Sequence, residues 1–177
     1  MTTYGDDVQI KFLHNPLSFH KDAMRAAQAS MAAERQGRFW PYHDTLFANM
    51  KSLDDESLNQ FAKELGLDVE QFKKDRKDKK IQERIDADQT AVVKLGAKGT
   101  PAFFVNGIHV KGAKPFPEFK KIIDAELEKV NAKIASGVAA DNAVYAVFKE
   151  NTKRLLTCWF DCCQSGSHHP HHPRSGK

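Results

Sequence analysis

Cysteine is scarce in this chain of 177 residues. The three cysteines, Cys158, Cys162 and Cys163, lie close together near the C-terminus with the spacing C-x-x-x-C-C. This spacing is not a Cys-x-x-Cys motif, and cysteines so close in sequence cannot staple distant parts of a fold. The sequence therefore excludes a disulfide framework, and we do not expect these cysteines to act as a redox pair.

Long apolar runs are also lacking. No stretch of about 18 apolar residues occurs, so the sequence predicts no membrane-spanning helix and no membrane partner. Residues 1–7 are polar and acidic, without the basic and apolar regions of a signal peptide. For the chain as written, this pattern predicts a cytoplasmic location.

A strong charge of one sign is missing as well, since the formal net charge is +4 at pH 7. The densest basic stretch, residues 73–80, is interrupted by Asp75 and Asp78 and contains no aromatic residue. This interleaving favours a solvated helix face with ion pairs over a nucleic-acid patch. We therefore expect no nucleic-acid partner.

The residues that are present suit a globular domain with strands and helices. Residues 8–13 alternate between apolar and polar and then become apolar, which predicts a strand. Helical patterns follow over residues 19–34, from Phe39, after Asp54, after Asp68 and over residues 79–95. Asp54 and Asp68 are predicted N-caps, and Gln71 is expected to complete a capping box with Asp68.

The segment Gly99–Gly107 reads Gly-Thr-Pro-Ala-Phe-Phe-Val-Asn-Gly and predicts the first strand of a hairpin. Proline suits the start of a strand because it donates no hydrogen bond. Asn-Gly between two apolar runs is the strongest short-range hairpin signal, and Ile108–Val110 would form the second strand. Two further helices are predicted, from about Pro115 to Ile134 and over residues 141–151.

Four segments in this order carry a family resemblance: Asn15–His20, Gly37–Asp44, Gly99–Gly107 and Pro115–Phe119. From Val8 to about residue 149 the chain resembles the DsbA-like thioredoxin-fold oxidoreductases, in particular bacterial members with a helical insertion. The resemblance implies an α/β, thioredoxin-like fold with that insertion. It also implies an extended polypeptide substrate and, for full-length members, a periplasmic or other extracytoplasmic location.

The resemblance also implies a site. Pro101 would be the cis-proline of the family, Thr100 the neighbour that tunes the redox pair, and Gly99, Thr100, Pro101 and Ala102 the substrate-binding loop. The family's first strand and its Cys-x-x-Cys helix take about 30 residues and are expected to be missing before Val8. No catalytic residue is therefore assigned, and neither a metal nor a cofactor is expected.

The domain assignment follows from these observations. Residues 1–150 are expected to form a DsbA-like thioredoxin domain that is incomplete at its N-terminus, and residues 151–177 a disordered tail rich in Cys and His. The His-rich tract, residues 168–172, is not expected to be a dedicated metal site with Cys162 and Cys163. His20 and His43 are expected to be core or surface residues without an acid–base role.

Three functions remain open at this point. The chain is a redox-silent member of an oxidoreductase family, a non-catalytic module that binds peptides through the proline loop, or a fragment without a selected function. Loss of a central strand would leave two strand edges unpaired, which favours aggregation or a homodimer through those edges.

Overall fold

The structure is a computed structural model that describes residues 3–152. These residues belong to two compact units, residues 3–92 and 93–152. The predicted tail lies outside the described residues from position 153 on, so its predicted disorder stays a prediction, as does the assignment of residues 1–150 to one domain.

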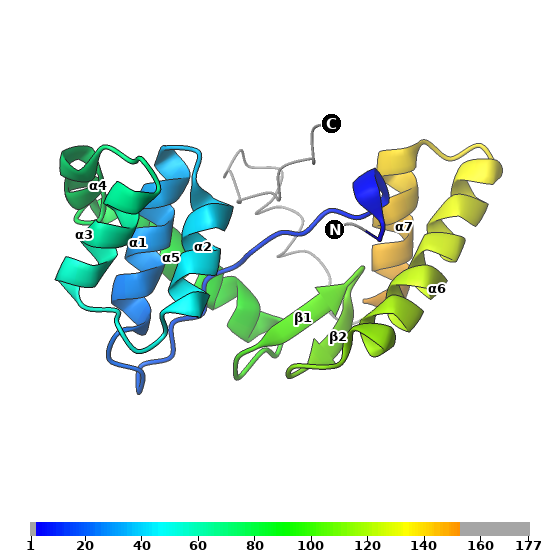
Figure 1. The fold of residues 1–177 in the computed structure, drawn as a ribbon. Helices are drawn as coiled ribbons and strands as arrows, with labels where there is room; N and C mark the ends of the chain where they lie inside the picture. The colour runs from blue at the N-terminus through cyan, green and yellow to red at the C-terminus, as the bar shows by residue number, and fades with distance from the viewer. Residues whose placement is uncertain (1–2, 153–177) are drawn as a thin grey trace. The chain divides into compact units, whose positions relative to one another are not determined.

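The first unit is helical (Figure 1). It contains the short 3-10 helix η1 (Gly5–Asp7) and the helices α1 (Ala23–Arg35), α2 (Phe39–Ala48), α3 (Asp55–Glu64), α4 (Val69–Asp75) and α5 (Lys79–Lys94), the last of which runs into the second unit. The predicted helices are thus present. The first of them begins at Ala23 and not at residue 19.

Two aspartates begin α3 and α4 as predicted. The backbone N–H of Ser57 donates to Asp54 Oδ1 at 2.9 Å, and the backbone N–H of Gln71 donates to Asp68 Oδ1 at 2.9 Å. Each bond satisfies one of the N–H groups that the first turn of a helix leaves without a partner. Short segments of this length need such caps because isolated helices of one or two turns are unstable.

The predicted capping box at Asp68 is wrong in its second half. The Gln71 side chain does not return to the backbone of Asp68 but donates to Asp75 Oδ1 at 3.0 Å. The Asp68 N–H donates instead to Gln36 Oε1 at 2.9 Å. Asp75 is buried, and a buried carboxylate needs donors more than an exposed N–H needs an acceptor.

Small side chains let the helices of the first unit pack closely. Ala29, Ala32 and Ala33 of α1 are fully buried. They pack in one core with larger residues of α2 to α5, namely Tyr42, Leu58, Phe61, Phe72, Ile81 and Ile85. The Tyr42 hydroxyl donates to the Leu58 carbonyl at 2.9 Å, so the polar end of this buried ring is satisfied. Burial raises the pKa of Tyr42.

The predicted strand at Val8–Leu13 is wrong. Of residues 8–17, Lys11 alone forms a bridge, and the others belong to no helix or strand. The segment is held by side chains of α5 instead: the His14 N–H donates to Asp88 Oδ2 at 3.1 Å, and Gln89 Nε2 donates to the Pro16 carbonyl at 2.9 Å. Alternation predicts that a segment can be a strand, but only a neighbouring strand makes it one.

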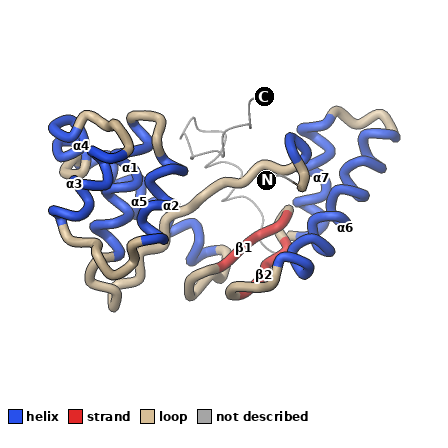
Figure 2. Tube along the Cα trace, viewed as in Figure 1, coloured by secondary structure: helices blue, strands red, loops and turns tan. Residues whose placement is uncertain are grey.

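The second unit contains the predicted hairpin and two helices. These are β1 (Ala102–Val105), β2 (Ile108–Lys111), α6 (Phe116–Ala135) and α7 (Ala140–Asn151). The antiparallel strands pair from Ala102 with Lys111 to Val105 with Ile108 (Figure 2). Val130, Ala143 and Val147 form a small core between α6 and α7.

The turn between the strands explains the hairpin. Asn106 and Gly107 both have positive φ, 45° and 88°. A two-residue hairpin turn that follows the twist of its strands requires this backbone conformation, which Asn and Gly adopt most easily. The predicted hairpin is confirmed.

Across residues 3–152, every helix is too short or too polar to span a lipid bilayer.

Candidate functional site

The predicted loop lies at the entrance to β1. Gly99, Thr100 and Pro101 are exposed, and Ala102 is half-buried as the first residue of the strand. The peptide bond between Thr100 and Pro101 is cis. The structure therefore places the four predicted residues together on one accessible stretch of main chain.

A hydrogen bond fixes the loop to the far end of the hairpin. The Gly112 N–H donates to the Pro101 carbonyl at 3.1 Å, directly beyond the Ala102–Lys111 pair. A Cβ atom at Gly99 would meet nothing within 4 Å, and the φ of Gly99 is not in the left-handed region. The loop is thus anchored on its strand side and open at its start.

The two faces of the hairpin differ. Phe103 and Val110 lie opposite each other, and the Phe103 ring packs on Phe119 of α6 with centroids 4.8 Å apart. On the other face, Phe104 stacks on His109 with centroids 4.6 Å apart. Alternate residues of a strand point to opposite faces, so one face of the hairpin rests on α6.

The hairpin turn is held by α7. The Asn151 side-chain N–H₂ donates both to the Asn106 carbonyl at 2.9 Å and to Glu126 Oε2 at 2.8 Å. Lys129 pairs with the other carboxylate oxygen of Glu126. The Glu126 residue is buried, with 2% of its surface exposed. This network joins the turn, α6 and α7.

Sequence reasoning missed both Glu126 and Asn151. A signal for Glu126 was present, because it lies four residues from Ile122 and from Val130, on the apolar stripe of α6. A carboxylate on such a stripe indicates a buried partner, since unpaired charges are rarely buried.

No thiol accompanies the loop among the described residues. Residues 3–152 contain no cysteine, and Cys158, Cys162 and Cys163 lie outside the described part of the chain. His43 of α2 packs against the ring of Phe47 and lies 2.9 Å, Nδ1 to Oδ1, from Asp44. The chemistry that the loop itself supports is main-chain hydrogen bonding to an extended segment.

Comparison of the sequence with protein-family models places it in a family. The family model described as DSBA-like thioredoxin domain matches residues 1–124. No solved structure matches the chain.

Curated relatives are of two kinds. The Na(+)/H(+) antiporter NhaA of Herminiimonas arsenicoxydans is 41% identical over 110 residues, which is 62% of this chain and 17% of the antiporter. The probable disulfide bond formation protein D of Bacillus cereus is 36% identical over 132 residues, which is 69% of this chain and 59% of that protein. The matches thus span less than one fifth of the antiporter and about three fifths of the Bacillus protein.

Proposed function

The chain belongs to the family of DSBA-like thioredoxin domains, and on this premise we propose that its Gly99–Ala102 loop binds extended polypeptides without exchanging disulfides. Its fold is the α/β, thioredoxin-like one, mostly helical with a small antiparallel sheet. The observation that carries the proposal is an accessible, anchored proline loop in a region, residues 3–152, that contains no cysteine.

The loop supports strand-like binding. Main-chain groups bind a peptide best when they are exposed and held in place, because the loop that carries them then loses little conformational entropy on binding. Gly99, Thr100 and Pro101 are exposed, and the bond from Gly112 to the Pro101 carbonyl holds the loop. A polypeptide that lies along this loop would add hydrogen bonds and a strand-like contact.

The proposal that the chain does not exchange disulfides rests on the chemistry of its cysteines. Thiol–disulfide exchange requires a thiolate that attacks a disulfide sulfur, and a helix N-terminus or a nearby cation raises the fraction of thiolate at neutral pH. Cys158, Cys162 and Cys163 have the wrong spacing for such a pair. A relative is named for disulfide bond formation, and that activity is not assigned to this chain.

The substitution Gly99→Val tests binding at the loop. The added side chain enters open space on a backbone that tolerates it, so the fold should persist while the approach of a peptide is blocked. The matched control is Ala135→Val, at an exposed position at the end of α6. Affinity for a short, unstructured, cysteine-free peptide is measured by isothermal titration calorimetry.

We expect Gly99→Val to weaken peptide binding by about tenfold or more, the equivalent of 1.4 kcal/mol. Ala135→Val should bind as the unsubstituted chain does, and both variants should give the same circular dichroism spectrum. Equal affinity of the two variants for the peptide would refute binding at this loop.

A further inference from the structure

A polar cavity of about 380 Å³ lies in the first unit. Small-molecule sites start at roughly 300 Å³, but most of them are lined by apolar side chains. Here the lining is polar and comes from α1, α3, α4 and the turn after α4: Arg25, Gln28, Asp55, Asn59, Lys73, Arg76 and Lys77. The charged side chains of this lining favour a charged ligand.

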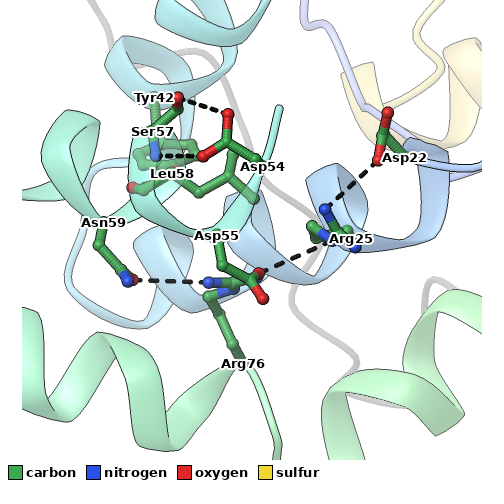
Figure 3. Close-up of polar contacts among 9 residues, drawn as sticks. All are labelled: Asp22, Arg25, Tyr42, Asp54, Asp55, Ser57, Leu58, Asn59 and Arg76. Atoms are coloured by element: carbon green, nitrogen blue, oxygen red, sulfur yellow. Dashed lines mark hydrogen bonds and ion pairs between the residues drawn. The ribbon is translucent and has the colours of Figure 1, made fainter. Parts of the chain in front are cut away.

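The lining contains four cations and one carboxylate, and two neighbouring carboxylates, Asp22 and Glu70, pair with Arg25 and Lys73. The carboxylate, Asp55, accepts a hydrogen bond from Arg76 Nη2 at 2.6 Å and lies 3.7 Å from Arg25 Nε (Figure 3). The bond from Arg76 lowers the pKa of Asp55, so the carboxylate is ionised at neutral pH. Arg25 Nη1 also lies 3.4 Å from Asp22 Oδ1, so Arg25 is paired with two carboxylates and Arg76 with Asp55.

Arg76 has donors to spare. Its side chain is 11% exposed, and its Nε has no hydrogen-bond acceptor within the described residues. Its Nη1 reaches Asn59 Oδ1 only at 3.5 Å, which is at the limit for a hydrogen bond. A planar guanidinium is well suited to bind an oxyanion through two oxygens, and an oxyanion would reach the buried Nε of Arg76 only after this side chain moves.

Two lysines complete the lining. Lys77 is exposed and has no ion-pair partner among residues 3–152. Lys73 pairs with Glu70 at 2.8 Å, but Glu70 is exposed, and such surface pairs are weak enough to exchange for a better partner. Both ammonium groups are therefore free to turn toward an anion.

We propose that this cavity is a binding site for a phosphate-bearing small molecule. A phosphate group offers several oxygens to the guanidinium and ammonium groups that line the cavity, and the volume leaves room for the organic group that carries it. The proposal gives part of the stretch at residues 73–80 a role beyond that of a solvated helix face. It is independent of peptide binding at Gly99–Ala102.

Titration with inorganic phosphate tests this proposal, with sodium chloride keeping the ionic strength constant. Amide chemical shifts of the ¹⁵N-labelled chain are followed. The test variant is Lys73→Gln with Lys77→Gln, and the matched control is Lys74→Gln with Lys80→Gln, which removes two exposed lysines that do not line the cavity. Both double variants lose the same net charge.

Saturable shifts are expected around Arg25, Asn59 and Arg76, with the control retaining the affinity of the unsubstituted chain. The test variant should bind phosphate on the order of tenfold more weakly, because two nearby charges are lost. The proposal is overturned if phosphate causes no saturable shifts at these residues, or if both double variants weaken binding equally. The second result would show attraction to overall charge and not a site.

Discussion

At Gly107, the hairpin turn packs directly against the side chains of Phe148 in α7 and of Thr152 just after that helix. A Cβ atom at this position would lie 2.3 Å from Thr152 Cγ2 and 3.2 Å from the Phe148 ring. The φ of 88° adds a second restriction, since residues with a Cβ rarely adopt it. Glycine is therefore required here for two separable reasons.

Substitution of Gly107 should separate the effect of the backbone conformation from the effect of the clash. We expect Gly107→Ala to lower the local stability of the hairpin by about 2–4 kcal/mol, from the backbone conformation and the clash together. Gly112→Ala is the control, because its φ is also positive but its Cβ would meet nothing within 4 Å, so it should cost only about 1–2 kcal/mol. Hydrogen exchange of the β1 and β2 amides measures both.

The clash has its own test. Thr152→Ser removes Cγ2 while keeping the hydroxyl that donates to the Phe148 carbonyl at 2.7 Å. In the Thr152→Ser variant, Gly107→Ala should lower the local stability of the hairpin measurably less than it does in the unsubstituted chain. If Gly107→Ala and Gly112→Ala cost the same in the unsubstituted chain, the close approach of Thr152 has no energetic weight.

Between elements, a polar network joins the parts of the second unit beside its small apolar core. Asn151 bridges the Asn106 carbonyl and the Glu126 carboxylate, and Glu126 is almost fully buried. Buried polar networks of this kind fix one arrangement because a half-satisfied network is costly. The turn of the hairpin, and with it the strand that leads from the loop, depends on this bridge.

Loss of the bridge should therefore unfold the unit locally. We expect Asn151→Ala to cost about 1–3 kcal/mol, because it leaves Glu126 Oε2 and the Asn106 carbonyl without this donor. Asn142→Ala changes an exposed position of the same helix. Apart from the gain that the higher helix propensity of Ala brings, it should lower the free energy of unfolding by at most a few tenths of a kcal/mol. Urea unfolding followed by backbone amide signals of α6 and α7 compares them; equal midpoints would contradict the role of the bridge.

Local signals predicted most elements. The caps at Asp54 and Asp68 and the Asn106–Gly107 turn are governed by residues within a few positions, so the sequence alone is enough to place α3, α4 and the hairpin. The strand prediction at Val8–Leu13 was wrong because a strand needs a neighbouring strand to pair with, and the local sequence pattern does not show whether one is there. The bridge between Glu126 and Asn151 was missed because the two residues lie 25 positions apart.

For the whole molecule, family membership determines how the loop is interpreted. The four residues Gly99–Ala102 were predicted as one substrate-facing loop, and in the structure the first three are exposed and Ala102 is half-buried. Their binding role stays a prediction, as does a homodimer through unpaired strand edges. Peptide binding and dimerisation both involve a second molecule, and neither the sequence nor the structure of a single chain includes that molecule.

One measurement addresses binding and exchange together. The ¹⁵N-labelled chain, reduced beforehand, is titrated by NMR with a peptide that carries an internal disulfide, alongside the variant Cys158→Ser, Cys162→Ser, Cys163→Ser. The account predicts saturable shifts at the amides of Gly99, Thr100 and Ala102 in both proteins, with the peptide disulfide intact. No shifts at these amides, or faster reduction of the peptide by the unsubstituted chain than by the variant, would contradict it.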